Sequence, residues 1–266
     1  MKVFCPAFFK KAGGAHESFL PGFFSKKPEK GEIMERIDKI LALHNFGSRK
    51  EVGALIRKGG VTVNGSPVKK ADEKIDPEKD EIRVLGEPVT LRRHVVLMMN
   101  KPGGVLSASR DPKAETVVDL LEPELYRRGL FPAGRLDKDT EGLLILTDDG
   151  DLAHRMLAPK SHVYKLYQAR LDKPATREDA ALFAQGLHAG ELECLPAELI
   201  LGDDPCEVQV RIREGKFHQI KRMFHAVGKE VVYLKRLAIG NLKLDPALEL
   251  GQTRLLSEEE LTKIFE

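Results

Sequence analysis

The spacing of apolar positions near the start of the chain predicts two short amphipathic helices. In residues 36–46 and again in residues 49–59, apolar side chains recur three or four positions apart, which places them on one face of a helix. Ser48, followed three residues later by Glu51, is typical of a capping box at the start of the second helix. Two helices with one apolar face each predict a small unit with its own core. This unit begins at about Met34.

The stretch that follows has the pattern of short strands. Two β-rich runs flank Asn64-Gly65, a dipeptide that favours a two-residue hairpin turn, and another strand is expected at residues 82–85. The Gly, Pro and polar content of residues 86–93 is typical of a linker. We therefore expect a first domain at residues 34–85, then this linker, and a second domain at residues 94–266.

The second domain mixes strand and helix patterns. A continuous apolar run at residues 94–100 is typical of a buried strand. We expect further strands at 105–108, 142–147, 163–171 and 206–213, and helices at 114–121, 151–157, 177–187, 218–228 and 257–265. These segments follow no regular βαβ repeat, so the pattern predicts an α+β fold with a mixed or antiparallel sheet.

Composition narrows the class of protein. Of the 266 residues, 42% are hydrophobic and 32% are charged, and no apolar run approaches the roughly 18 residues that a membrane span needs. The three cysteines show no CxxC spacing, so we expect neither a disulfide framework nor a structural zinc site. These features indicate a cytoplasmic protein that does not enter a membrane.

Residues 1–33 lack apolar periodicity. They could be mistaken for a targeting peptide, but Pro6 and the pair Lys10-Lys11 interrupt any continuous apolar core. We expect a flexible extension, with Met34 as a candidate for the physiological start of the chain.

Charge is divided unevenly within the first domain. The whole chain has a formal net charge of only +2, yet residues 34–70 hold eight Lys and Arg against three Asp and Glu. The second predicted helix leaves four basic side chains exposed: Arg49, Lys50, Arg57 and Lys58. This surface is either a solvated helix face or a surface that binds the phosphates of a nucleic acid.

Three charged residues precede the predicted strand at 142–147. In "GRLDKDTEGLLILT", Arg135, Asp137 and Asp139 alternate along the chain, and residues two apart in an extended segment face the same way. The segment is either a surface loop with paired charges or a carboxylate held at the edge of a cleft, where it could act as a nucleophile or a base.

A basic cluster lies about 80 residues later in the sequence. In "REGKFHQIKRMFHAVG", Lys216, Lys221 and Arg222 surround the start of a predicted helix. A cation delivered to Asp137 would keep that carboxylate ionised, whereas the alternative is a helix that only contacts phosphates.

A third candidate lies on the strand expected at 163–171. Lys165 and Tyr167 are two residues apart and would share one face of this strand. They are either half-exposed sheet residues or a site where the tyrosine ring stacks on a base. The chain has no Walker-type loop, GxGxxG, HExxH or EF-hand spacing, so we expect no nucleotide cofactor and no metal.

Taken together, these segments resemble a known family. "AGRLDKDTEGLLILTDDGDLAHRML" closely resembles the signature of pseudouridine synthases, in the branch that contains the RsuA and RluB/E/F enzymes. "YKLY" and "EGKFHQIKRMF" match the other two motifs of this branch in the expected order, and "LMMNKPGGVLSA" matches its strand–turn element. Residues 34–85 look like the S4 RNA-binding domain that this branch carries, so the resemblance runs from about Met34 to Glu266.

The resemblance implies a set of site residues. It makes Asp137 the catalytic aspartate, Tyr167 the aromatic residue at the base, and Lys221 the basic partner of the aspartate, where other branches have arginine. The further residues that we expect to contact substrate or RNA are Arg135, Lys165, His218, Gln219 and Arg222, together with Arg49, Lys50, Arg57 and Lys58 of the S4-like domain. The implied reaction is an isomerisation without net redox change, so no cofactor is expected. Asp137 would either attack C1′ of the ribose or remove a sugar proton, and the sequence does not choose between these routes.

The identity of the RNA depends on fewer residues. Large-subunit enzymes of this branch tend to carry Asn-Arg where this chain has Phe217-His218, so the chain looks more like the RsuA group, which modifies one uridine of 16S ribosomal RNA, uridine 516. The alternatives are a 23S-directed relative and an S4 RNA-binding or assembly factor without catalysis. We expect a monomer with ribosomal RNA, or a small-subunit assembly intermediate, as its partner.

Overall fold

A computed structural model describes residues 34–123, 125–158 and 161–266. Residues 1–33, where the sequence predicts a flexible extension, lie outside the described residues. The chain divides into two compact units, Met1–Arg93 and His94–Glu266, and each is described by itself. Within the described residues, no helix is long and apolar enough to cross a membrane.

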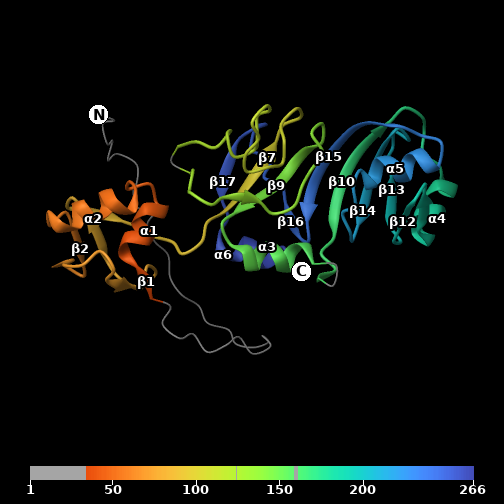
Figure 1. The fold of residues 1–266 in the computed structure, drawn as a ribbon. Coiled ribbons are helices and arrows are strands. Elements are labelled where there is room, and N and C mark those ends of the chain that lie inside the picture. The colour runs from red at the N-terminus through yellow and green to blue at the C-terminus, as the bar shows by residue number, and fades with distance from the viewer. Residues whose placement is uncertain (1–33, 124, 159–160) are drawn as a thin grey trace, which may run out of the picture. The chain divides into compact units, whose positions relative to one another are not determined.

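The N-terminal unit contains two helices packed beside small antiparallel sheets (Figure 1). Its apolar core combines Ile37, Ile40 and Leu41 of the first helix with Val52 and Ile56 of the second, as the apolar spacing predicts. The elements are β1 (Glu35–Arg36), α1 (Ile37–Leu43), α2 (Arg49–Arg57), β2 (Val61–Val63), β3 (Ser66–Pro67), β4 (Lys74–Ile75), β5 (Ile82–Val84) and β6 (Glu87–Val89).

The capping box and the hairpin turn that the sequence predicts for this unit are both present. Ser48 and Glu51 form a complete capping box at the start of α2, which satisfies backbone N–H groups that the helix itself leaves unpaired. Asn64 and Gly65 both have positive φ and connect β2 to β3. The region expected to be a linker, residues 86–93, differs from the prediction, because its β6 pairs with β5 in the four-stranded sheet. Pro88 is compatible with this strand because β6 lies at the edge of the sheet.

The C-terminal unit is built on one large mixed sheet. Its strand order is β13-β14-β10-β15-β9-β7-β17, with β16 beside β15 and β8 beside β9. The strands of this sheet are β7 (Val96–Lys101), β8 (Phe131–Pro132), β9 (Glu141–Thr147), β10 (Lys165–Leu171), β13 (Glu198–Leu201), β14 (Glu207–Ile212), β15 (Val231–Ile239), β16 (Leu242–Lys243) and β17 (Thr253–Leu255). β11 (Leu187–Ala189) and β12 (Leu192–Cys194) form a separate two-stranded sheet. The helices are α3 (Gly150–Leu157), α4 (Arg177–Gln185), α5 (Gln219–Ala226) and α6 (Glu258–Lys263). The predicted α+β fold with a mixed sheet is confirmed.

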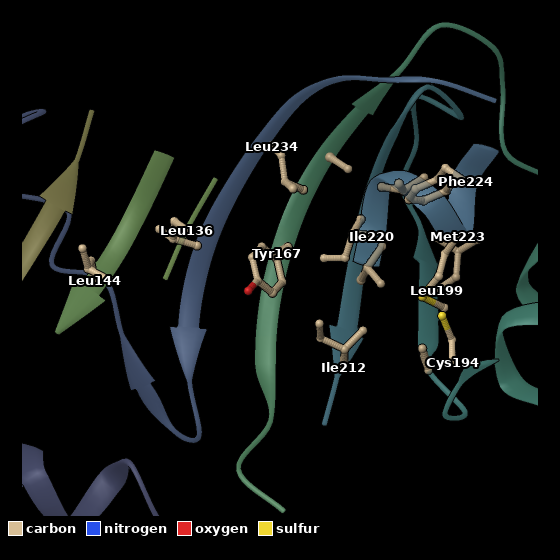
Figure 2. Packing of buried hydrophobic residues seen from close by; sticks show 14 of the residues in the cluster. Leu136, Leu144, Tyr167, Cys194, Leu199, Ile212, Ile220, Met223, Phe224 and Leu234 are labelled. Carbon is tan, nitrogen blue, oxygen red and sulfur yellow. The ribbon is translucent and has the colours of Figure 1, made fainter. Parts of the chain in front are cut away.

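Alternate residues of the central strands enter two different cores. Met98 and Ile145 pack with α3 and α6 on one face, whereas Leu97 and Leu144 belong to a second core on the opposite face. This second core continues across β10 and β14 to α4 and α5 (Figures 1 and 2). Because the middle of the sheet is covered on both faces, β7 is buried along its whole length, which explains its continuous apolar run.

Two expected elements are wrong. Residues 105–108 form only an isolated bridge, Leu106 to Thr116, and residues 114–121 form successive turns rather than a helix. Asp119 accepts hydrogen bonds from the backbone and hydroxyl of Thr116, an arrangement that stabilises a local turn. Pro123 follows closely and disfavours helical backbone at the residue before it, so no helix continues from this turn.

The one parallel pair among the described strands joins β9 to β15. Arg236 of β15 lies opposite Gly142 of β9, where a Cβ atom would approach the Arg236 carbonyl oxygen to 2.2 Å. Gly142 also has a φ of +99°, a conformation that L side chains rarely adopt. This glycine therefore permits β15 to approach the segment that leads out of the "GRLD" motif.

Candidate active site

A cavity lies over the middle of the sheet in the C-terminal unit. Tyr167, Ile212 and Leu234, from β10, β14 and β15, contribute apolar surface to it. Arg135, Leu136, Asp137 and Thr140 line it from the loop before β9, and Gly215, Lys216, His218, Gln219, Ile220 and Lys221 line it from the start of α5. Figure 2 shows Tyr167 with Leu136 on one side and Ile212 and Ile220 on the other. The loop before β9 and the start of α5, about 80 residues apart in the sequence, thus meet beside Tyr167 of β10.

The loop that carries Asp137 is held in place by buried polar groups. The Ser107 hydroxyl donates to the carbonyl of Leu136 at 2.9 Å and accepts from its N–H at 3.1 Å. The Lys101 ammonium donates to the carbonyls of Pro102, Lys138 and Thr140 at 2.9–3.2 Å. Burial lowers the pKa of Lys101 to about 8, although nearby carboxylates, with that of Asp139 having the largest effect, act in the opposite direction. These contacts fix the backbone on both sides of Asp137.

Lys221 connects the two carboxylates of the "GRLDKD" motif. Its Nζ lies 3.3 Å from Oδ2 of Asp137 and 2.6 Å from Oδ1 of Asp139. Asp137 is half-buried, with 23% of its side chain exposed, whereas Asp139 is 74% exposed. The hydrogen bond from Lys221 lowers the pKa of Asp139. The expected basic partner of Asp137 is therefore in place, and it also binds a second carboxylate.

The turn before α5 brings the side chain of His218 close to the carboxylate of Asp137. Nε2 of His218 lies 3.6 Å from Oδ1 of Asp137, and the His218 backbone is left-handed, with a φ of +50°. Gln219 is buried and stabilises this turn: its Oε1 accepts from the N–H of Lys216, and its Nε2 donates to Glu214. We expected Gln219 to contact RNA; it lines the cavity, and its buried amide also holds this turn.

Tyr167 lies in a buried environment with two cations. Nη1 of Arg236 is 3.5 Å from the tyrosine hydroxyl, and Nε of Arg236 donates to the Leu143 carbonyl at 2.7 Å. Nη2 of Arg236 is buried with no hydrogen-bond partner among the described residues. Lys165 shares the face of Tyr167, as expected, but only 8% of it is exposed, and burial together with Arg236 lowers its pKa to about 8. Lys165 is therefore a buried residue beside the cavity rather than a surface contact for RNA.

A second cavity, of about 330 Å³, adjoins the first. His218 and Lys221 line both, and this one also contacts Ala189, Gly190, Arg222, His225, Ala226 and Glu230. Arg222 donates to the Ala189 carbonyl at 3.1 Å, so it links α5 to β11 as well as facing this cavity. Arg135 is exposed at the rim of the first cavity.

The four basic residues expected on the N-terminal unit are all exposed. Arg49 has a structural partner as well, since its guanidinium donates to the buried carboxylate of Asp38 at 2.9 and 3.2 Å. Burial alone would raise the pKa of Asp38, but hydrogen bonds from Arg36 and Arg49 lower it overall. Lys50, Arg57 and Lys58 have no such partner within the described part of the chain, so their charges face solvent.

This arrangement suits chemistry at a sugar carbon. A fixed carboxylate lies at the edge of a cavity that has an aromatic floor, and the Lys221 ammonium lies 3.3 Å from it. Within the described residues, no three His, Cys, Asp or Glu side chains are close enough to hold a metal ion. A planar base could stack on the tyrosine while its ribose meets the carboxylate.

Comparison with known proteins decides the family. Residues 95–226 match the RNA pseudouridylate synthases, and residues 35–82 match the S4 domain. An uncharacterized RNA pseudouridine synthase of Bacillus subtilis, YtzG, is 52% identical over 230 residues, which cover 85% of this chain and 96% of that protein. The chain belongs to the RNA pseudouridylate synthase family. It is therefore a pseudouridine synthase, an enzyme, with an S4 domain at its N-terminal side.

Other pseudouridine synthases agree with this assignment. The ribosomal small subunit pseudouridine synthase A of Salmonella typhimurium is 40% identical over 233 residues, covering 86% of this chain and 99% of that protein. A crystal structure of a pseudouridylate synthase aligns with a TM-score of 0.60 at 36% identity, covering 86% of this chain and 99% of the other. Both matches extend across the S4 domain and the synthase domain.

Sequence reasoning missed three residues of this site. Lys101 lies in the quoted "NKPGG" segment, but a lysine after a buried strand gave no sign that it would be fully buried. Arg236 interrupts the apolar pattern of β15, and this strand was not predicted. Asp139 had no expected role, although its spacing from Asp137 was the signal that both carboxylates could reach one cation.

Proposed function

We propose that this enzyme converts one uridine of 16S ribosomal RNA to pseudouridine, with uridine 516 as the expected target. The observation that carries the proposal is the position of Asp137, 3.3 Å from Lys221 at a cavity that Tyr167 also lines. The 40% identity to a ribosomal small subunit pseudouridine synthase A supports the choice of small-subunit RNA. The Phe217-His218 pair, which resembles the same group, supports it further.

The reaction requires one bond at the sugar to break and another to form. The C1′–N1 bond breaks with its electron pair on the uracil, the ring turns, and C5 bonds to C1′. C5 then loses its hydrogen as a proton, and N1 gains one, so the product is an isomer of the substrate. Asp137 acts either by bonding to C1′ or by removing a proton from C2′, and both routes need the ionised carboxylate.

The other residues orient these groups. Tyr167 stacks on the uracil, which must leave its own base stack before it can enter the cavity. Lys221, 3.3 Å from Asp137, fixes the direction of this carboxylate, and Asp139 holds Lys221 from the solvent side. In a cavity that excludes water once RNA is bound, these charge interactions are stronger than in bulk water.

The S4 domain supplies affinity through phosphate contacts, and the synthase domain selects the uridine. Lys50, Arg57 and Lys58 are the residues proposed for the phosphate contacts. The enzyme would act as a monomer in the cytoplasm on free ribosomal RNA or on a small-subunit assembly intermediate.

Mapping of pseudouridines in ribosomal RNA tests the function. Cells with and without the gene are compared by carbodiimide labelling and primer extension along both large ribosomal RNAs. We expect one pseudouridine of 16S ribosomal RNA to disappear and to return when the gene is restored. Loss of a 23S site instead would favour the large-subunit alternative, and no loss in either RNA would contradict the proposal.

A further inference from the structure

Phe217 is exposed beside the candidate active site. With 74% of its surface accessible, it is the most exposed of the large hydrophobic residues within the described part of the chain. Exposure of a phenylalanine ring leaves apolar area in contact with water, which is unfavourable unless a partner covers it. Phe217 also directly precedes His218, the residue that lies 3.6 Å from Asp137.

The ring of Phe217 is held in a defined orientation. It stacks on the imidazole of His218, with 3.8 Å between the ring centroids and 18° between the planes. The left-handed backbone of His218 is uncommon for a residue with a side chain, and it is fixed by the hydrogen bonds of Gln219 beneath the turn. One face of the Phe217 ring is therefore covered by His218, and the high exposure leaves the other face available.

We propose that the free face of Phe217 stacks on the base of a nucleotide next to the target uridine. This inference rests on the proposed function, because it requires an RNA with one uridine held at Asp137. When that uridine leaves the helix, a neighbouring base loses its stacking partner, and the Phe217 ring, between the cavity-lining residues Lys216 and His218, replaces it. The stack of base, Phe217 and His218 then ends at Asp137, which couples recognition of the flanking base to the reactive carboxylate.

The charges around Phe217 favour RNA over an apolar protein segment. Lys216 precedes it and pairs with Glu214 at 2.9 Å, and Lys221 on the first turn of the helix that follows is held by Asp137 and Asp139. Arg222, one residue further on, has no ion pair among the described residues, so its guanidinium is the cation available to a phosphate. An apolar partner would have to cover these cations, whereas the phosphates of a nucleotide are attracted to them. The adjoining cavity of about 330 Å³, lined in part by Lys221 and Arg222, offers space for the ribose and phosphate next to the stacked base.

A set of modified RNAs tests the contact. The probes are synthetic RNAs that span the uridine identified by mapping, each with one abasic nucleotide at one of the two positions on either side. Affinity is measured for the wild-type enzyme, for Phe217→Leu, which keeps apolar volume without an aromatic face, and for Phe217→Trp, which keeps the aromatic face. Because the side chain is exposed, all three proteins should fold alike, which thermal melting checks.

We expect one abasic position to weaken binding to the wild-type enzyme and to Phe217→Trp by about fivefold or more. The same abasic position should change binding to Phe217→Leu by less than twofold, because the stacking partner is already absent. 2-Aminopurine at that position should be quenched by the wild-type enzyme and not by Phe217→Leu. Equal losses for the wild-type enzyme and Phe217→Leu at every position would overturn the inference while leaving the function intact, if the wild-type enzyme still forms pseudouridine in the RNA. Failure to form pseudouridine in any ribosomal RNA would overturn both.

Discussion

Replacing Lys221 by methionine should slow catalysis strongly without a comparable loss of RNA binding. The ammonium lies 3.3 Å from Asp137, and two unit charges at this distance attract each other by about 5 kcal/mol at an effective dielectric constant of 20, or about 1 kcal/mol in bulk water. Both side chains are 23% exposed, so we expect a value between these limits, about 2–4 kcal/mol. Lys221 also fixes the direction of the Asp137 carboxylate, so losing an interaction of this size in the transition state corresponds to a fall in kcat of about 30- to 1000-fold.

Single-turnover release of tritium from RNA labelled at C5 of uridine measures this effect, because C5 loses its hydrogen in the reaction. Lys221→Arg keeps the charge and should recover most of the rate. Asp139→Asn serves as a comparison: it removes the other carboxylate bound to Lys221, and because Asp139 is 74% exposed we expect a smaller loss of rate than for Lys221→Met. A kcat for Lys221→Met within threefold of the wild-type value would refute the role of the cation. Equal inactivity of the methionine and arginine variants would show that charge is not what Lys221 supplies.

Three further predictions concern binding and stability. Tyr167→Phe should change RNA affinity by less than twofold and Tyr167→Ala by about fivefold or more, because the ring and not the hydroxyl stacks on the base; equal losses in a titration would contradict this. Replacing Lys50, Arg57 and Lys58 together by alanine should reduce the slope of log affinity against log salt by about 0.7–0.9 for each lost phosphate contact, and an unchanged slope would mean that these residues are only solvated. Because burial lowers the pKa of Lys165 to about 8, its ammonium destabilises the fold fully below pH 8 and less as pH rises toward 10.5. Lys165→Met should therefore increase the free energy of unfolding near neutral pH, by at most about 3 kcal/mol, and a gain in denaturant titrations that is as large at pH 10 as at pH 7 would contradict this.

The elements that the sequence predicted correctly are those whose determinants are local. The capping box of Ser48 and Glu51 and the Asn64-Gly65 turn depend on a few neighbouring residues, and they appear in the structure as expected. On β10, Tyr167 and Ala169 are buried and Arg170 is exposed, an alternation that reflects a sheet covered on one face there. For β7, β9, β10 and β14, the apolar pattern alone was sufficient to predict a strand.

The elements that were missed depend on contacts distant in the sequence. β15 carries the buried Arg236, whose burial is possible only because the Leu143 carbonyl and the Tyr167 hydroxyl lie beside it. The expected helix at 114–121 had suitable apolar spacing, but Asp119 and Pro123 stabilise turns instead. A pattern of apolar residues does not show which backbone groups will be satisfied by side chains.

The same limit applies to the candidate site. Motif resemblance selected Asp137, Tyr167 and Lys221, and the structure brings all three to one cavity. Gln219 was grouped with the RNA contacts because it lies in the same motif, yet its amide is used to hold the turn. Proximity in sequence shows that residues belong to one site, and only the fold shows which of them face the substrate.

Complementation with Asp137→Asn tests the central claim most directly. A strain without the gene receives either the wild-type gene or the Asp137→Asn variant at equal protein level, and pseudouridines in its ribosomal RNA are mapped by carbodiimide labelling. The variant keeps the size of the side chain and one acceptor oxygen, and it removes the negative charge beside Lys221. We predict that the wild-type gene restores one pseudouridine in 16S ribosomal RNA and that the variant restores none, although the purified variant binds the RNA with near wild-type affinity. Restoration of that pseudouridine by Asp137→Asn to the wild-type extent would contradict the assignment of Asp137 as the catalytic carboxylate.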